Sequence, residues 1–298
     1  MGLFIALAAL MASAQAGPFA WRWDPAAPQR FHAEVVIDTP EAVTLVGAAN
    51  LEARVVQTVI AADFTCTPAA AKKGWTLDCA YTSVAMKGKA VAKDQGSADA
   101  LWGELAGLLG QAHMQIQVRP DGGLKDLDLE GVPKGDARRA RQQEQLRMLS
   151  KRVVAPLFVV MPKGGEDPGK AWKVSGFSPA FELLDESSTT GGVSLETAVV
   201  AQAGNTWKLR SEGKGSVATQ VEVEGGIGAS TAMKVLAESR FDPQAGLVVF
   251  AEQLSTGDRL AVGTQLGGSP RYSCAGWVGR VNADGTVEGA DGPMKLQP

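Results

Sequence analysis

The residues best suited to do chemistry in this sequence are three cysteines, Cys66, Cys79 and Cys274. Cys66 ends the strand-like run RVVQTVIAADFTC, and Cys79 lies inside a second such run, WTLDCAYTSVAM. The loop between them begins with the turn-forming pair Thr-Pro, so two strands joined by it would bring the two thiols side by side. A disulfide closing a loop of this size stabilises a fold by about 3 kcal/mol. We expect a Cys66–Cys79 disulfide with Cys274 unpaired, while Cys274 as the partner of either one stays open.

The sequence contains few of the residues that acid–base catalysis and metal binding usually need. The only two histidines are His32 and His113, which leaves most metal sites and most Ser/His or Cys/His triads without their parts. Three carboxylates alternate at Asp126, Asp128 and Glu130, but the glycine and the closing glutamate of a calcium loop are missing. This acidic run is more typical of the exposed face of a strand.

Nucleotide-binding and hydrolase patterns are also missing. The run GKGS at 213–216 lacks the spacing of a phosphate-binding loop, and neither G-x-S-x-G nor H-E-x-x-H occurs. We therefore expect no enzyme, no cofactor and no metal. The net charge of −3, from 29 basic and 32 acidic residues, gives no support for nucleic acid as a partner.

Tryptophan is unusually frequent, with seven Trp against two Tyr. Trp fills large apolar spaces and often keeps its N–H near a polar partner. The simpler interpretation is packing in the core and in hairpins, and the sharper one is an apolar groove that binds a ligand. The candidate ligand-binding residues are Trp102, Leu105, Leu109, Trp172 and Trp207.

The segment 138–152 is strongly basic, and its role stays open. One interpretation is docking onto an anionic surface, such as lipid head groups or an acidic partner. The other is the solvated back of a helix, because at 100° per residue the basic side chains spread over more than half of the circumference. That spread leaves a free apolar seam of Leu146, Leu149 and Val153. We favour the solvated helix.

The first sixteen residues have the pattern of an export signal. Residues 2–12 are almost wholly apolar, and the small residues Ala14 and Ala16 match an A-x-A cleavage site before Gly17. No basic residue precedes the apolar run, and the alternative is a buried N-terminal helix. We expect cleavage after Ala16, a periplasmic or secreted protein, and no transmembrane span in the mature chain.

Alternation with a period of two residues dominates the rest of the chain and predicts half-buried strands. In the run 31–38, Phe31, Ala33, Val35 and Ile37 share one face. Turn residues follow several such runs and predict antiparallel hairpins at 119–124, 203–205, 241–247 and 281–287.

Two helices interrupt the strands. The first is expected to begin after an N-cap at Ser97 and to carry Leu101, Leu105, Leu108 and Leu109 at helical spacing. The second is expected over 136–154. We therefore predict an α+β fold that is mostly antiparallel β, one continuous sheet built from hairpins with two helices packed on it; the curved sheet or incomplete barrel is what the resemblance described below implies. The expected organisation is a signal peptide at 1–16 and a single β-rich domain at 17–298, with strand-rich halves at about 28–133 and 170–257 and a loose C-terminal hairpin and tail at 258–298.

This order of elements resembles a group of exported bacterial β-rich proteins, the lipoprotein-carrier group. The resemblance runs over roughly 28–257 and includes the strand start Gly-Lys-Ala-Trp at 169–172. It implies a strongly curved, incomplete barrel covered by helices, which in such folds often holds an apolar ligand against the concave sheet.

The leading hypothesis for function is a soluble, exported, non-catalytic binding or carrier module for an apolar or amphipathic small molecule or a lipid in the cell envelope. The alternative is a structural or accessory subunit of a cell-envelope protein assembly, with the same fold, a filled interior and an envelope protein as its partner.

Overall fold

A computed structural model of the chain describes residues 19–23, 27–48, 50–71, 73–162, 171–177, 187–221, 228–261 and 271–289. The predicted export signal at 1–16 lies outside these residues. No helix in the described ranges is long and apolar enough to cross a membrane.

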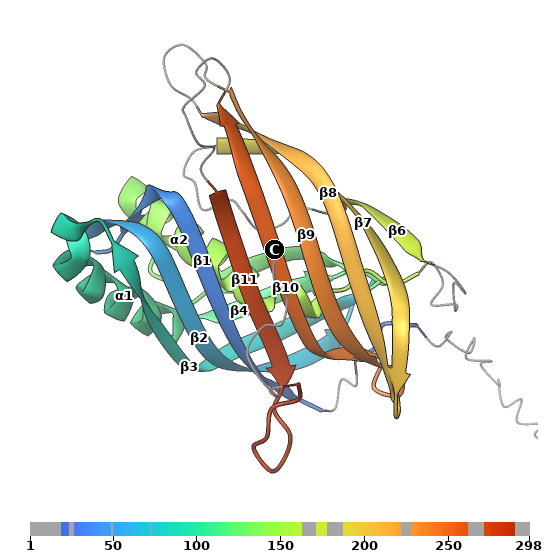
Figure 1. Cartoon of the computed structure of the whole chain (residues 1–298). Helices are drawn as coiled ribbons and strands as arrows, with labels where there is room; N and C mark the ends of the chain where they lie inside the picture. The colour runs from blue at the N-terminus through green and yellow to red at the C-terminus, as the bar shows by residue number, and fades with distance from the viewer. Residues whose placement is uncertain are drawn as a thin grey trace, which may run out of the picture.

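The described strands form one antiparallel sheet of eleven strands, in the order β5-β4-β3-β2-β1-β11-β10-β9-β8-β7-β6. Figure 1 shows this sheet strongly curved, with β11 near its middle. The predicted fold class, a mostly antiparallel curved sheet with two helices, is confirmed. The strands are β1 (Gln29–Val46), β2 (Glu52–Ala70), β3 (Trp75–Ala90), β4 (His113–Val118), β5 (Leu124–Glu130), β6 (Trp172–Phe177), β7 (Ser187–Ala203), β8 (Thr206–Val221), β9 (Gly228–Asp242), β10 (Leu247–Ala261) and β11 (Arg271–Arg280).

The sheet has two halves that meet at β11. The N-terminal half is β1 to β5, and the C-terminal half is β6 to β10. The expected loose hairpin and tail at 258–298 is wrong for Arg271–Arg280, because β11 pairs with β1 on one side and with β10 on the other. Ala33 and Ala251 both pair with Val278 of β11, so a segment late in the sequence joins the two halves.

Strand alternation arises as the sequence predicts. Phe31, Ala33, Val35 and Ile37 of β1 are each at most 2% exposed, since they point to the concave inner face. His32 lies on the opposite, outer face, where its imidazole contacts Asp63 at 2.7 Å. Period-two side-chain direction therefore separates an apolar inner face from a polar outer face.

Helix α1 (Gln95–Leu109) packs its apolar stripe on the inner face of β2 and β3. It begins two residues before the expected N-cap Ser97, because a short 3-10 turn, η1 (Ala92–Asp94), leads into it and Asp94 is the N-cap. The Asp94 carboxylate accepts hydrogen bonds from the backbone N–H and the guanidinium of Arg54 on β2. These bonds attach the start of the helix to the sheet.

Helix α2 (Ala137–Val154) has the predicted bounds, and the side chain of Asp136 caps it by accepting from the Arg139 N–H. Figure 1 shows α2 behind β1 and β11, and it contacts both of these strands as well as β5. A second 3-10 turn, η2 (Ala155–Leu157), continues it towards β10.

The expected solvated back of this helix is wrong for its C-terminal part. Besides the predicted seam, Gln142, Gln145, Met148, Ser150 and Arg152 are buried there. The curved sheet surrounds the helix on more than one side, so few directions remain that point to water. Arg138 also has a structural role, because its guanidinium donates to the carbonyl groups of Gly47 and Leu51.

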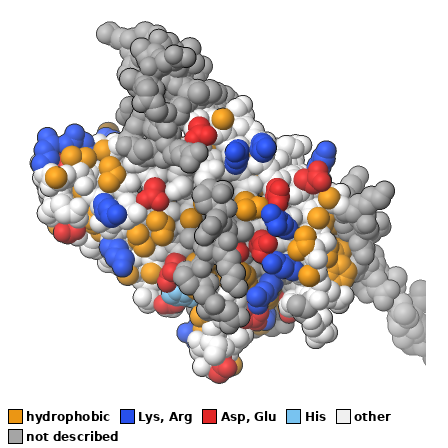
Figure 2. Space-filling view, viewed as in Figure 1, with side chains coloured by type: hydrophobic (Ala, Val, Ile, Leu, Met, Phe, Trp, Pro, Cys, Tyr) orange, Lys and Arg blue, Asp and Glu red, His pale blue; other side chains and the backbone are white. Residues whose placement is uncertain are grey.

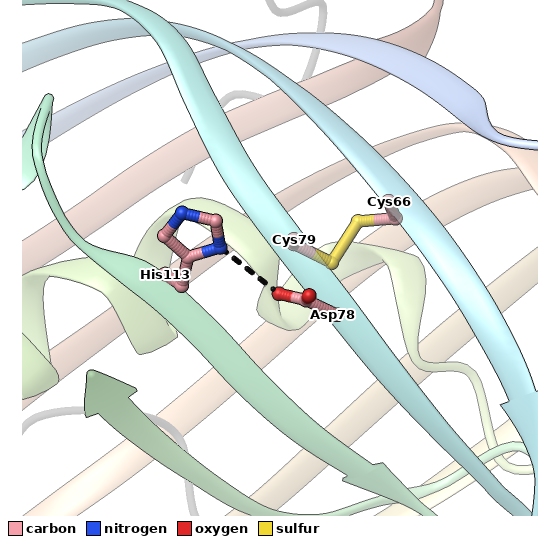
Figure 3. The surroundings of a disulfide bond; sticks show 4 residues. All are labelled: Cys66, Asp78, Cys79 and His113. Atoms are coloured by element: carbon pink, nitrogen blue, oxygen red, sulfur yellow. Dashed lines mark hydrogen bonds and ion pairs between the residues drawn. A yellow bond between two sulfur atoms is a disulfide. The ribbon is translucent and has the colours of Figure 1, made fainter. Parts of the chain in front are cut away.

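The Cys66–Cys79 disulfide is confirmed, and Cys274 is a free cysteine. The two bonded residues are directly opposite in the β2–β3 register, with Cα atoms 4.0 Å apart. Both are at most 1% exposed, on the inner face of the sheet. Figure 3 shows the disulfide between the two strands, with His113 and Asp78 paired beside it at 3.2 Å.

The predicted hairpin turns lie where the sequence places them, between β4 and β5, between β7 and β8, between β9 and β10, and after β11. In the turn between β9 and β10, Gly246 has φ +66°, a region that glycine adopts without strain. Its N–H donates to the carbonyl of Asp242 at 2.7 Å and closes the turn.

Candidate functional site

The inner face of the N-terminal half is filled with large apolar side chains. Trp102, Leu105 and Leu109 of α1 are at most 2% exposed and belong to the main hydrophobic core. Gly88 of β3 makes room for Trp102, since a Cβ on Gly88 would lie 3.0 Å from that ring. The structure thus places three of the five candidate ligand-binding residues inside a packed helix–sheet contact, and their ligand-binding role stays a prediction.

The inner face of the C-terminal half is built from smaller and more polar residues. Thr197 and Ser211 are buried there and share a hydrogen bond of 2.8 Å between their hydroxyl oxygens. The register continues this row from Ser211 through Ala237 to Gln253, and both of these residues are half-buried. We name these four residues, together with the buried Ser239 and Ser255, the polar belt.

On one side of the polar belt lies a second apolar cluster, separate from the main core. It consists of Val174, Val193, Leu195, Met233 and Val235 from strands β6, β7 and β9. Next to it Gly213 and Gly215 of β8 are half-buried on the same face. A Cβ on Gly213 would lie 2.5 Å from the Leu195 side chain and 2.8 Å from that of Val193, so glycine here lets these two side chains cover the backbone of β8.

On the other side of the polar belt is an aromatic end, which belongs to the main core. Trp172 lies opposite Thr197 of the belt and joins this end to the second apolar cluster. The ring of Phe19 contacts Trp207 at 4.5 Å between ring centroids, Trp172 at 5.9 Å and Phe241 at 6.3 Å. The structure therefore brings together Trp172 and Trp207, which the sequence proposed for an apolar groove, and places Phe19 of the same chain between them. Phe19 is 0% exposed, whereas both tryptophans are half-buried.

Sequence reasoning missed Phe19, although a signal was present. In the run FAWRW at 19–23, aromatic residues alternate with Ala20 and Arg22. The odd positions of this run are buried, and the even ones are not. A period-two pattern this short, next to a predicted cleavage site, does not by itself predict a buried extended segment.

The indole N–H groups differ in how well they are satisfied. Trp172 donates its Nε1–H to the carbonyl of Val160 at 2.8 Å. The Nε1 atoms of Trp21, Trp23 and Trp102 are buried and have no hydrogen-bond partner in the described part of the chain. An unsatisfied buried donor costs about 1–3 kcal/mol, so these three positions are held in place by packing.

Cys274 lies on the inner face of β11, opposite Ser255 of β10 and beside Arg152 of α2. Burial raises the pKa of the Cys274 thiol, and the neighbouring Arg152 guanidinium partly opposes this shift. The thiol form therefore predominates at neutral pH, and the thiolate that nucleophilic chemistry requires is disfavoured.

The outer face carries charges of both signs. Figure 2 shows Lys, Arg, Asp and Glu side chains interspersed over β8, β9 and β10. Lys208 pairs with Glu238 at 2.6 Å, and Arg210 pairs with Glu212 at 2.7 Å. Such cross-strand and same-strand pairs are typical of a solvated sheet face.

The acidic run of β5 also lies on an outer face. Asp126 and Asp128 are opposite Gln117 and Gln115 of β4, and both carboxylates are exposed. Within the described residues, no three His, Cys, Asp or Glu side chains gather into a group that could hold a metal ion.

No family model and no curated protein sequence matches this chain. Among solved structures, lipovitellin, described in terms of its lipid–protein interactions, matches with a TM-score of 0.50 and 9% sequence identity. The match covers 93% of this chain but only 27% of the lipovitellin chain. At this identity the likeness concerns the fold alone: the chain is similar in fold to part of lipovitellin.

Proposed function

We propose that this protein is a soluble, exported, non-catalytic binding or carrier module for an apolar or amphipathic ligand such as a lipid. The inner face of its C-terminal half carries the ligand. The observation that supports this most is the order of surfaces along that face: an aromatic end, the polar belt, and a second apolar cluster. An amphipathic molecule has the same alternation of apolar and polar parts.

The two halves differ in how much of the inner face is covered by helices, and this difference also supports a ligand site on the C-terminal half. The two helices contact β1, β2, β3, β5 and β11, and η2 contacts β10 and β11. Over the other strands of the C-terminal half, the cover includes Val160 at the second apolar cluster and Phe19 at the aromatic end. On the C-terminal half, Gly213, Ala237 and Gln253 remain half-buried. Ligand sites are mostly apolar surfaces with a few polar groups, and this face has that composition.

The disulfide supports an exported protein, and the fold likeness supports a lipid ligand. A buried disulfide is typical of oxidising compartments, so Cys66–Cys79 favours a periplasmic or secreted protein, as does the predicted export signal. The likeness to lipovitellin supports a lipid among the possible ligands. The low thiolate content of Cys274 favours a non-catalytic role.

A second candidate is a structural or accessory subunit of an envelope assembly. It is favoured by the packing of Trp102, Leu105 and Leu109, which leaves the N-terminal half with a filled interior. In that case the C-terminal half would also be filled, and function would depend on a protein partner.

Native mass spectrometry of the full chain, isolated from its own cells without detergent, separates the two. The carrier predicts an adduct of lipid-like mass that solvent extraction removes. A bare mass that co-purifies with another protein would contradict the carrier and support the subunit.

A further inference from the structure

We propose that the aromatic end of the C-terminal half is itself a ligand subsite, now filled by Phe19 of the chain's own segment Phe19–Trp23. An uncharged aromatic ring or an acyl chain would occupy it when this segment moves away, so ligand and segment compete. This inference rests on the proposed carrier function and adds to it the position and chemistry of the subsite.

The first argument is the shape of the contact. Phe19 contacts Trp172 of β6, Trp207 of β8 and Phe241 of β9, all of them more than 150 residues away in the sequence. A single ring thus fills a space with aromatic walls. Aromatic walls bind rings and methylene chains through dispersion and the hydrophobic effect, with no charge required.

The second argument is how the segment is held. It has no helix or strand geometry, and it lies against the turn between β9 and β10. The Arg22 N–H donates to the Gly246 carbonyl at 2.5 Å, and the Arg22 guanidinium donates to the Pro243 carbonyl at 2.7 Å. These bonds sit on the rim of the contact, where water can replace them.

The third argument is the energetic cost of keeping the segment docked. Trp21 and Trp23, both within this five-residue segment, are at most 4% exposed, and neither Nε1–H has a hydrogen-bond partner in the described residues. Each donor would recover a hydrogen bond to water on leaving. This gain offsets part of the packing energy that undocking loses. That energy comes from Trp21 on Trp75 and Phe158 and from Trp23 on Phe31.

Occupation by the segment lowers the apparent affinity for a ligand, because only the fraction of molecules with the segment undocked can bind. The probe for testing this is N-phenyl-naphthylamine, an uncharged aromatic molecule that fluoresces in apolar surroundings. Phe19→Ala removes the ring that competes for the subsite, and we expect the affinity for this probe to rise about tenfold, the factor for one lost contact of about 1.4 kcal/mol.

The matched control is Phe64→Ala. Phe64 is also a buried phenylalanine, 1% exposed, but it packs on Phe31 and Tyr81 in the N-terminal half. Loss of its ring should lower stability without raising probe affinity. An equal rise in both variants would overturn the proposal, since general loosening would then explain the binding.

The opposite change is a covalent lock, Arg22→Cys with Gly246→Cys. A Cβ on Gly246 would lie 2.6 Å from the Cβ of Arg22, about 1 Å closer than in a disulfide, and Gly246 has φ +66°. The lock therefore strains this turn, and Gly246→Cys alone is the control for that strain. We expect the oxidised double variant to lose probe binding and to regain it on reduction, while Arg22→Cys alone binds in both conditions.

The outcomes separate the two proposals. Binding to the unmodified protein that neither Phe19→Ala nor the lock changes would overturn the competing segment and leave the carrier function standing. The absence of binding in every variant, Phe19→Ala included, would count against both the subsite and the carrier.

Discussion

The two halves of the sheet use the same strand pattern to make different interiors. In the N-terminal half, inner-face positions hold Phe31, Ile60 and Leu77, and α1 adds Trp102 and Leu105. In the C-terminal half, the inner row through the polar belt holds threonine, serine, alanine and glutamine, and Gly213 and Gly215 lie beside the second apolar cluster. The difference shows that inner-facing position alone does not make a core; the volume of the side chains decides whether the space is filled.

The halves also differ in what covers them. Two helices and a buried disulfide stabilise the N-terminal half, whereas described residues of the C-terminal half are bound mainly to one another through long hairpins. We infer that the first half provides most of the stability, and that the second half retains the freedom that ligand binding requires.

The largest expected difference is in the cost of removing a leucine. Leu105 is 0% exposed between α1 and the sheet, so Leu105→Ala should lower the free energy of unfolding by about 2–5 kcal/mol. Leu195, 8% exposed in the second apolar cluster, should lose less than about 2 kcal/mol on the same change. Urea unfolding of both variants measures this, and equal losses would contradict the difference between the halves.

The cysteines give the next largest effect. The double variant Cys66→Ala/Cys79→Ala removes a cross-link with a sequence separation of 13 residues, and chain entropy predicts a loss of about 3 kcal/mol. Cys274→Ala in β11 is the control and should cost about 1 kcal/mol or less, because it removes one half-buried sulfur. A larger loss from the control would place the main stabilising contacts at the junction of the halves.

Two buried hydroxyl pairs allow the same substitution in each half. Ser150→Ala leaves the hydroxyl of Tyr81 without its partner, and burial raises the pKa of Tyr81, so this donor remains protonated and unsatisfied. We expect a loss of about 1–3 kcal/mol. Ser211→Ala leaves the hydroxyl of Thr197, 1% exposed, without its partner in the polar belt, and on a dry face the loss would be of the same size. The proposed ligand site admits water when it is empty, so we expect a loss of less than about 1 kcal/mol. Thermal unfolding compares the two variants, and equal losses would be evidence for a dry C-terminal half.

The smallest effect concerns the anchor of α1. Hydrogen bonds from Arg54 lower the pKa of Asp94, so the ionised carboxylate stabilises the fold. A lowered folded-state pKa gives stability that is present above the unfolded-state pKa and is lost as the pH falls through the folded-state value. Asp94→Asn should therefore be slightly less stable than the unmodified protein at neutral pH and equally stable in acid. A difference that persists in acid would exclude this ion pair as its cause.

Local patterns predicted much of this fold. Alternation located the strands, the Asp-Gly turns located the hairpins, and Asp136 located the start of α2, because each of these signals acts over a few residues. The Cys66–Cys79 pair was predictable for the same reason, since only one short hairpin separates the two residues.

Contacts between distant segments were not predictable in this way. The pairing of β1 with β11 joins Ile37 to Cys274, and nothing near either residue signals the other. The burial of Arg152 likewise depends on the curvature of the whole sheet. The meeting of Phe19 with Trp172 and Trp207 needs three segments at once, so the sequence named two of these aromatic residues without the one between them.

The account's central claim is that the inner face of the C-terminal half binds the ligand, and one matched pair of variants tests it most directly. Ala237 is half-buried on the inner face of β9, and Ala232 is exposed on the outer face of the same strand. Titration with a fluorescent fatty acid should show binding that Ala237→Phe weakens by about tenfold or more, the factor for a blocked contact of about 1.4 kcal/mol, and that Ala232→Phe leaves unchanged. Equal affinity in the unmodified protein and both variants would place the ligand elsewhere and contradict the claim.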